Sequence, residues 1–235
     1  MPEASQIKRM FGQIASRYDS ANHLLSVGLD YYWRRKLVSL VKVEEPKFVV
    51  DLATGSGDVA FALKKALSKE VKVMGLDFCR PMLVNAELKK KKCDYAKDLI
   101  FEFGDCMALP LEDASVDVLT IAFGFRNFSD RQKGLQEMKR VLKPGGRLFI
   151  LEFSQPAKWF KPLYYFYLKK ILPLIATLVT GHSDAYEYLV GSIEQFPDKD
   201  ALTLEINNSG FKDIQVLSMT VGMVCIHSAV AEPDL

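Results

Sequence analysis

The stretch from Phe48 to Ala60, FVVDLATGSGDVA, constrains the fold of this chain more than any other part of the sequence. An apolar run ends in the carboxylate of Asp51, and a glycine-rich turn then leads into an amphipathic segment that reaches Ser68. This order predicts a buried strand, a tight turn and a helix that packs back against the strand. Such a unit is typical of the beginning of an open α/β sheet.

Apolar runs and helical patterns alternate along the chain after this first unit. Further strands are predicted at residues 71–77, 99–105, 116–123 and 146–154, and further helices at 80–92 and 130–142. The turn Lys143-Pro144-Gly145-Gly146 is predicted to stop the second of these helices. The segment 211–230 holds two strand-like runs with no helix between them, which predicts a hairpin turn at Thr220–Gly222. The predicted fold class is α/β: a Rossmann-like, doubly wound, mostly parallel seven-stranded sheet with a C-terminal antiparallel hairpin.

We expect a single domain over residues 1–235, because a chain of this length can bury one sizeable core. Residues 1–45 read as helices that precede the sheet and close over it as a lid. Residues 155–200 are aromatic and mostly helical, and they interrupt the alternation after the fifth strand. They are interpreted as an insertion that serves the substrate.

The charge and the cysteines exclude several classes of function. The net charge is +2, which gives no global attraction to nucleic acid, and no nucleic-acid partner is expected. The four cysteines form no CxxC pair and no zinc-like spacing with histidine, so free thiols and no metal site are predicted. The start of the chain lacks the apolar core of a signal peptide, and lysines and prolines interrupt the apolar stretch 159–181. A cytoplasmic protein without a transmembrane segment is therefore expected.

The glycine turn by itself allows more than one ligand. Residues 55–60, GSGDVA, fit the dinucleotide fingerprint, with Asp77 at the expected distance, whereas a P-loop would need G-K-[ST]. Asp51 before the turn and Asp58 at the helix start would both repel a pyrophosphate. These carboxylates suit S-adenosylmethionine (SAM), which carries a sulfonium and an ammonium group and no phosphate. For Asp58 alone, a favourable interaction with the helix dipole is an equally good explanation.

Three carboxylates follow three strands, and a parallel sheet brings such positions to one edge. Asp51 is assigned to the amino end of the methionine moiety, Asp77 to the ribose hydroxyls and Asp105 to the adenine amine. The amide of Cys106 can donate to an adenine ring nitrogen. An ordinary loop with an Asx-turn is the alternative for this last segment.

Three longer segments resemble a known family. They are FGQIASRYDSANHLLSVGLDYYWRR at 11–35, FGFRNFSDRQKGLQEMKRVLKPGGRLFILEFSQP at 123–156 and DAYEYLVGSIEQFPD at 184–198. They are similar to signatures of the UbiE/MenG quinone C-methyltransferases, a group of the class I SAM-dependent methyltransferases. The chain departs from the family in its turn ATGSGD, where relatives often have a second glycine, and in Ala122, which replaces a serine of some relatives.

The resemblance implies C-methylation of a prenylated quinol ring, with SAM as cofactor and S-adenosylhomocysteine as product. The acceptor would be demethylmenaquinol, with the equivalent benzoquinol of the ubiquinone pathway as a second one. Residues that match the family's cofactor positions, together with the glycine turn, the strand ends and one lid tyrosine, form the candidate cofactor site: Tyr18, Asp51, Thr54, Gly55, Ser56, Gly57, Asp77, Asp105, Cys106 and Ala122.

The resemblance also implies residues for the chemistry and the substrate. C-methylation needs a nucleophilic ring carbon, which a deprotonated quinol hydroxyl supplies. Arg126 is the first candidate for stabilising the developing phenolate, and Asn127 for orienting the water or carboxylate that takes the proton. A surface salt bridge is the alternative role of Arg126. His182, Tyr186 and Tyr188 are candidates for lining the quinone pocket, with a structural role as the alternative for His182.

Other clusters have two interpretations each. Five residues are assigned to the lid over the cofactor, with helix packing as the alternative: Tyr18, Asp19, Asn22, Tyr31 and Trp33. The aromatic run 164–167 can shelter a prenyl tail, touch a membrane surface or pack in a core. The lysine run 89–92 is predicted to be a solvated helix end, with anionic lipid as a second partner. Peripheral contact with the inner face of the cytoplasmic membrane, a homodimer and a quinone-biosynthesis complex are compatible with these features.

Other functions stay open at this level. They are a SAM-dependent methyltransferase for another small molecule or for RNA, a dinucleotide oxidoreductase, and a non-catalytic membrane-associated scaffold with the same fold. The acidic strand ends disfavour the oxidoreductase, and the intact glycines and carboxylates disfavour the scaffold.

Overall fold

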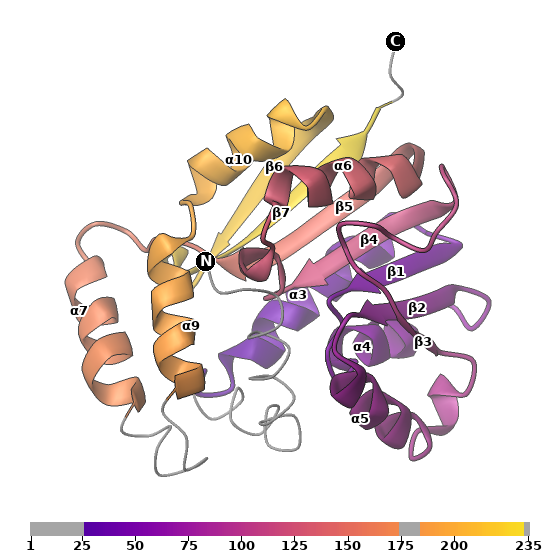
Figure 1. Cartoon of the computed structure of the whole chain (residues 1–235), viewed down its shortest axis with the longest axis horizontal. Coiled ribbons are helices and arrows are strands. Elements are labelled where there is room, and N and C mark those ends of the chain that lie inside the picture. The colour runs from indigo at the N-terminus through magenta and orange to yellow at the C-terminus, as the bar shows by residue number, and fades with distance from the viewer. Residues whose placement is uncertain (1–25, 174–183, 233–235) are drawn as a thin grey trace.

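The computed structural model describes residues 26–173 and 184–232. Its centre is one seven-stranded sheet with the order β3-β2-β1-β4-β5-β7-β6 (Figure 1). The strands are β1 (Phe48–Leu52), β2 (Lys72–Asp77), β3 (Ile100–Phe103), β4 (Val116–Ala122), β5 (Leu142–Phe153), β6 (Phe211–Met219) and β7 (Val224–Ala231). The first five strands pair in parallel, and β7 runs antiparallel between β5 and β6. The predicted fold class is confirmed, including the C-terminal hairpin.

Helices cover both faces of the sheet, which explains why its strands are nearly continuous apolar runs. Neighbouring residues of a strand point to opposite faces. Val49 of β1 packs in a cluster with α3 (Leu29–Val43) and α4 (Asp58–Ala66). Val50, the next residue, packs in the cluster that contains α6 (Arg131–Val141) and α10 (Lys199–Asn208). The other helical segments are α5 (Arg80–Lys90), η1 (Asp94–Ala96), η2 (Phe125–Asn127) and η4 (Thr220–Gly222). Ala96 of η1 packs in the first of these two clusters and Phe125 of η2 in the second.

The strand order reverses around β1, which lies between β2 and β4. In open α/β sheets a crevice forms at such a switch point, outside the carboxyl ends of the strands. The glycine turn follows β1 at this place. Gly57 there has a φ of +88°, and a Cβ atom on it would lie 2.6 Å from Cζ of Phe101. Only glycine allows both this left-handed conformation and this close approach.

The helical insertion stands beyond the carboxyl ends of β4 and β5 (Figure 1). It contains α7 (Lys161–Phe166), a π-helical segment η3 (Tyr167–Ile171) and α9 (Asp184–Gln195). It has its own apolar cluster, in which Tyr164, Leu168 and Ile193 are buried. The insertion is therefore anchored by its own small core beside the sheet.

Two predicted boundaries are wrong. The insertion was predicted to reach residue 200, but α10 begins at Lys199, and its Leu202 and Ile206 belong to the core of the sheet. The Asp198 side chain caps this helix by accepting from the Ala201 amide at 2.9 Å. The helix that the turn 143–146 was predicted to stop does end there, at Val141, but the strand after it begins earlier than predicted. β5 begins at Leu142, which pairs with Val116, and the register shifts before Arg147 pairs with Val118.

The predicted N-terminal lid is only partly described. Tyr18, Asp19 and Asn22 lie outside the described residues, as does His182. None of the helices in the described ranges combines the length and the hydropathy that a membrane-spanning segment needs.

Candidate cofactor and substrate site

One cavity of about 590 Å³ opens at the carboxyl ends of the strands. We call the part formed by the strand ends and the glycine turn the cofactor half. Eight of the ten predicted cofactor residues line it: Asp51, Thr54, Gly55, Ser56, Asp77, Asp105, Cys106 and Ala122. Gly57 does not line the cavity but shapes the turn, and Tyr18 lies outside the described residues. The sheet thus brings together side chains that are far apart in the sequence.

The other part of the cavity, which we call the apolar half, lies under the helical insertion. Its walls come from α7, η3 and α9 and from the end of β5, and they include Phe153, Leu163, Tyr164, Phe166 and Ile193. The two halves form one continuous space. Among the described residues, no group of three or more histidine, cysteine or acidic side chains is arranged to hold a metal ion.

Asp51 is a buried carboxylate with two hydroxyl donors. Its Oδ2 accepts from Oγ1 of Thr54 at 2.6 Å, and its Oδ1 accepts from Oγ1 of Thr120 at 2.7 Å. Burial raises the pKa of Asp51 to about 7, although the two hydrogen bonds favour the charged form; the nearby charge of Asp77 raises it further. A cation bound beside Asp51 would shift this balance towards the carboxylate.

Asp77 connects the glycine turn to the end of β2. Its Oδ2 accepts from the Gly55 amide and its Oδ1 from the Cys79 amide, each at 2.7 Å. Burial raises the pKa of Asp77, and the backbone hydrogen bonds oppose this rise. A carboxylate oxygen can accept more than one hydrogen bond, so this side chain can hold the turn and still accept from a ligand hydroxyl.

Lys89 is a site residue that the sequence interpretation missed. The lysine run 89–92 was predicted to be solvated, but Nζ of Lys89 donates to Oγ of Ser56 at 2.9 Å and to Oδ1 of Asp58 at 2.8 Å. Nη1 of Arg34 lies 3.0 Å from the other oxygen of Asp58. Two cations therefore pair with Asp58, which also lines the cavity, and the expectation that its carboxylate faces a cationic ligand stays a prediction. Helical spacing was the available signal, because Lys89 shares a face of α5 with the buried Met82.

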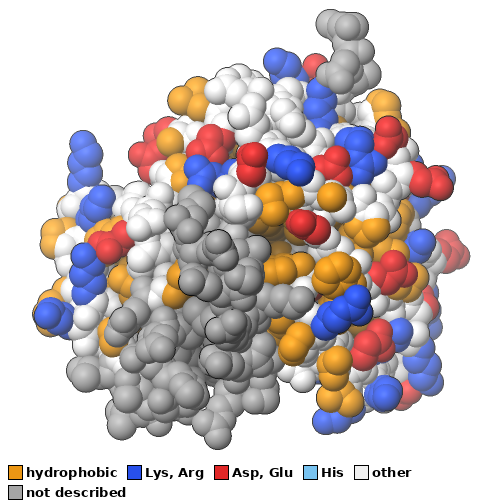
Figure 2. Space-filling view, in the orientation of Figure 1, with side chains coloured by type: hydrophobic (Ala, Val, Ile, Leu, Met, Phe, Trp, Pro, Cys, Tyr) orange, Lys and Arg blue, Asp and Glu red, His pale blue; other side chains and the backbone are white. Residues whose placement is uncertain are grey.

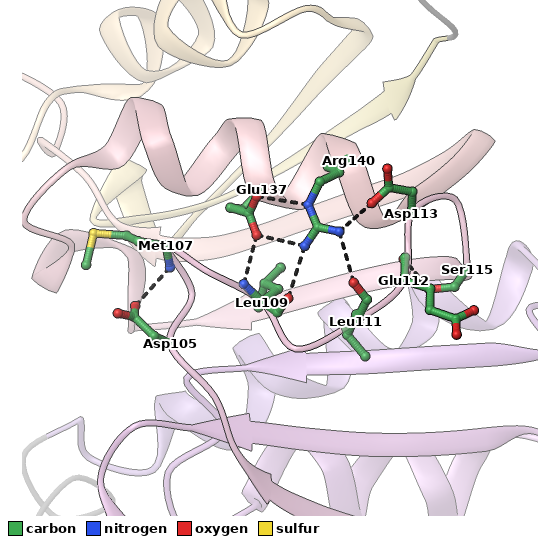
Figure 3. A network of polar contacts seen from close by, with 9 residues as sticks. All are labelled: Asp105, Met107, Leu109, Leu111, Glu112, Asp113, Ser115, Glu137 and Arg140. Atoms are coloured by element: carbon green, nitrogen blue, oxygen red, sulfur yellow. Dashed lines mark hydrogen bonds and ion pairs between the residues drawn. The ribbon is translucent and has the colours of Figure 1, made fainter.

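The loop that carries Asp105 is held by α6 (Figure 3). Oδ1 of Asp105 accepts from the Met107 amide at 2.9 Å, so the Asx-turn considered above is present. Glu137 accepts from the Leu109 amide at 2.8 Å, and Arg140 donates to the carbonyls of Leu109 and Leu111 at 3.0 and 2.9 Å. Two side chains of one helix thus hold the backbone just after Asp105.

The thiol of Cys106 is buried, and burial raises its pKa to about 12, with a contribution from the charge of Asp77. It therefore stays protonated near neutral pH and is a poor nucleophile. Only the backbone of this residue remains available for the predicted contact with adenine.

Arg126 forms a buried ion pair that involves a second residue missed in the sequence. Its Nη1 lies 3.0 Å from Oε1 of Glu152 and also donates to the carbonyl of Phe123, and its amide donates to Oε2 of Glu152 at 3.1 Å. Both side chains of the pair are almost fully buried. The guanidinium lies over the Phe153 ring, 5.3 Å from its centroid. The alternative of a surface salt bridge is wrong, because the ion pair is buried, and Arg126 lines the cavity.

Of the other residues predicted for catalysis and for the quinone pocket, only some lie at the cavity. The hydroxyl of Tyr188 on α9 donates to Oδ1 of Asn127 at 2.8 Å, which joins the insertion to η2. Asn127 lines the cavity and Tyr188 does not. Tyr186 lies in α9, and its side chain is not among those described.

Trp33 packs in the core and also lines the cavity. Its indole donates to Oγ1 of Thr220 at 2.8 Å, and its ring packs against Phe123 and Phe153. Only 4% of Trp33 is exposed, whereas Tyr31 is mostly exposed on the same helix. Helix packing, the alternative interpretation, therefore describes Trp33.

Comparison with known proteins identifies the family. The model of the ubiE/COQ5 methyltransferase family matches residues 2–231. The chain belongs to this family. A demethylmenaquinone methyltransferase from Thermus thermophilus is 44% identical over 221 residues, which cover 93% of this chain and 98% of that protein. A ubiquinone/menaquinone biosynthesis C-methyltransferase UbiE from Geobacter sp. strain M21 is 40% identical over 226 residues, which cover 96% of each chain.

Solved structures show the same fold at lower identity. A SAM-dependent methyltransferase from Aquifex aeolicus has a TM-score of 0.59 at 23% identity, covering 82% of this chain and 88% of that one. One from Thermotoga maritima has a TM-score of 0.67 at 17% identity, covering 95% and 99%. The predicted family and fold are confirmed, and this member of the ubiE/COQ5 family is a SAM-dependent methyltransferase.

Proposed function

We propose that this ubiE/COQ5 family member transfers a methyl group from SAM to a ring carbon of a prenylated quinol. Demethylmenaquinol, which becomes menaquinol, is the first acceptor, and the demethylated benzoquinol of the ubiquinone pathway is the second. The observation that carries the proposal is the cavity, which joins an acidic cofactor half to a large apolar half and has Arg126 in its wall. The names of the relatives from Thermus and Geobacter support the same substrate class.

The residues of the cofactor half fit SAM. Three carboxylates, those of Asp51, Asp77 and Asp105, line a space that Gly55 leaves open to the backbone. We assign Asp51 to the ammonium of the methionine moiety, Asp77 to the ribose and Asp105 to the adenine amine. When bound, the cofactor supplies an electrophilic methyl group on a sulfonium ion. The protein positions the ring carbon against it, and such positioning is worth about 7–11 kcal/mol in well-oriented reactions.

Arg126 is assigned to the oxygen of the acceptor ring. Its guanidinium stays charged at every physiological pH, so it can stabilise a phenolate but cannot act as the base. Glu152 holds this guanidinium in the wall of the cavity through its carboxylate. Glu152 itself does not line the cavity, so its role is to position Arg126. Asn127, fixed by Tyr188, is assigned to the water that carries the proton away.

The apolar half is assigned to the prenyl tail and to the membrane that holds it. Leu163, Phe166 and Ile171 line the cavity and are exposed to solvent, so this part of the cavity wall presents apolar side chains. Trp159 on the same segment is 76% exposed. Several basic side chains, some apolar ones and an acidic one lie along the left edge of the molecule, on the side of α7 (Figure 2). Such a face suits the boundary between anionic headgroups and acyl chains.

The proposal therefore includes a cytoplasmic protein in peripheral contact with the inner face of the cytoplasmic membrane. In a homodimer or a larger quinone-biosynthesis complex, the same apolar face would be buried against protein and not against lipid. Binding to vesicles at a monomeric mass separates these arrangements.

Methyl transfer from labelled SAM tests the proposed function. The acceptors are chemically reduced demethylmenaquinone and a demethylated benzoquinol, each in lipid vesicles. The matched variants are Arg126→Lys, which keeps the charge and loses the planar fork, and Arg126→Gln, which loses the charge. We expect label in menaquinone, a large loss of turnover in both variants, and unchanged affinity for S-adenosylhomocysteine.

The outcomes decide between the alternatives. Label in both quinones shows a dual-use enzyme. Binding of SAM with no label in either quinone contradicts the quinol proposal and favours another small-molecule acceptor. A protein that binds neither cofactor nor quinol would be a scaffold with the methyltransferase fold.

A further inference from the structure

The hydroxyl group of Tyr164 is buried without a hydrogen-bond partner among the described residues. The side chain lies in the wall of the apolar half and is 6% exposed. Most buried hydroxyls in native proteins are paired, because an unpaired one is costly. The two neighbouring tyrosines follow this rule, since Tyr165 donates to Gln155 and Tyr188 donates to Asn127, both at 2.8 Å.

The surroundings of Tyr164 make its hydroxyl a donor. Burial raises the pKa of Tyr164 well above its usual range, with a smaller contribution from Tyr165, so the group stays protonated near neutral pH. Arg126 lines the same cavity, its guanidinium lies over the Phe153 ring, and Phe153 packs against the apolar cluster that contains Tyr164. Its helix passes into the π-helical segment η3 directly after Phe166, and such irregular turns are frequent at functional sites.

We propose that the Tyr164 hydroxyl binds an oxygen of the acceptor ring as a second hydrogen-bond donor beside Arg126. This inference rests on the proposed quinol substrate and names a contact that recognises it. Such a donor stabilises the negative charge that forms on the ring oxygen when the quinol is deprotonated ahead of methyl transfer, and the proton of the hydroxyl remains on Tyr164. The hydroxyl thus acts by binding and electrostatics, and no bond to hydrogen breaks at this residue.

Two phenylalanine variants and two ring probes test the inference. The variants are Tyr164→Phe and, as a matched control on the same helix, Tyr165→Phe, whose hydroxyl is paired with Gln155 and does not line the cavity. The probes are an alkylated 1,4-dihydroxynaphthalene and the same alkylated naphthalene without hydroxyls. Dissociation constants are measured on the full chain under anaerobic conditions with S-adenosylhomocysteine bound.

We expect Tyr164→Phe to weaken binding of the dihydroxy probe about tenfold, a typical effect for one lost hydrogen bond to a buried group. Binding of the probe without hydroxyls should not change. The midpoint of thermal unfolding without ligand should stay the same or rise, because no hydrogen bond of the protein is lost. Tyr165→Phe should leave both dissociation constants unchanged.

An equal loss for both probes in Tyr164→Phe would show a packing role and overturn the inference. Equal binding of the dihydroxy probe by the wild type and Tyr164→Phe would also overturn the inference. That result would leave the proposed function intact. A wild-type protein that does not prefer the dihydroxy probe would contradict the quinol substrate and, with it, this role of Tyr164.

Discussion

At the scale of single residues, the site depends on buried charges whose partners come from distant parts of the chain. Asp51 is held by Thr54 and Thr120, and Arg126 by Glu152. Each of these charges costs free energy when it is removed from water, and each is tolerated because hydrogen bonds or an opposite charge compensate. Changes at these positions therefore affect stability and binding in ways that pH and conservative substitutions can separate.

Asp51 should make both stability and cofactor binding depend on pH. Its pKa of about 7 in the folded protein lies above the ordinary aspartate pKa of 3.8. The folded state therefore keeps a proton that the unfolded state loses, and the free energy of unfolding should fall as the pH rises from about 4 to 7 and level off above. The contribution is at most about 4 kcal/mol, from 1.36 kcal/mol per pKa unit. Asp51→Asn should remove this slope in chemical denaturation measured from pH 5 to 8.

The affinity for SAM should show the opposite trend. An ammonium group favours the ionised form of Asp51, so below about pH 7 binding must first release a proton. Titration calorimetry should show affinity rising with pH, by up to about tenfold per unit, until it levels off near pH 7. A flat profile in the wild type would contradict the assignment of Asp51 to the cofactor's amino end.

Glu152 should matter for stability and turnover but not for cofactor binding. Glu152→Ala leaves the Arg126 charge buried without its carboxylate, which costs about 3–5 kcal/mol when one partner of a buried pair is removed. Glu152→Gln retains one acceptor and should be milder. Both variants should lower methyl transfer to the quinol while calorimetry shows unchanged affinity for S-adenosylhomocysteine. Full turnover by Glu152→Gln would mean that Arg126 needs no such positioning.

At the scale of elements, turns and helix faces place the site residues. The glycine turn is pressed against β3, and α6 clamps the loop that follows β3 through Glu137 and Arg140 (Figure 3). Lys89 of α5 and Arg34 of α3 meet on Asp58 at the start of α4. The cofactor half is therefore built by contacts between elements, and its shape should be sensitive to substitutions that change how they fit.

Gly57→Ala should be more harmful than Gly145→Ala. Both glycines have a φ near +80°, where an alanine costs about 1–2 kcal/mol. At Gly57 the new Cβ would also lie 2.6 Å from the Phe101 ring, whereas at Gly145 nothing lies within 4 Å. Denaturant unfolding should show a larger loss for Gly57→Ala, and only this variant should weaken SAM binding. Equal losses would show that the contact with Phe101 relaxes without cost.

At the scale of the whole molecule, the sheet presents the cofactor half and the insertion adds an apolar half that reaches the surface. Trp159 and Phe166 lie exposed on this side, and Leu204, which is also exposed, lies on α10. A protein that draws a quinol out of a bilayer needs such a face in contact with lipid. This requirement joins the proposed substrate to the proposed location.

Removing the exposed aromatics should weaken binding to vesicles that contain anionic lipid. Burial of a large apolar side chain is worth about 1.5–3 kcal/mol, so the double variant Trp159→Ser/Phe166→Ser should bind at least about tenfold more weakly in co-sedimentation. Leu204→Ser is the matched control and should bind as the wild type does. Turnover with quinol in vesicles should fall while turnover with a short-tailed quinol in detergent is kept. Equal effects of all these substitutions would argue against a membrane-facing insertion.

The sequence by itself determined the alternation of strands and helices, the α/β sheet with a reversal of strand order, and the acidic residues at the strand ends. These features follow from the hydrophobic period, the turn residues and the order of neighbouring residues. Asp51, Asp77 and Asp105 could be placed at one edge since parallel strands end together. It did not show that Lys89 turns inward, that Glu152 holds Arg126 or that Trp33 packs in the core. A buried acid such as Glu152 signals that a partner exists, but only the packing of distant segments decides which one. The unpaired hydroxyl of Tyr164 likewise exists only in three dimensions, because hydrogen-bond satisfaction is a property of the folded chain.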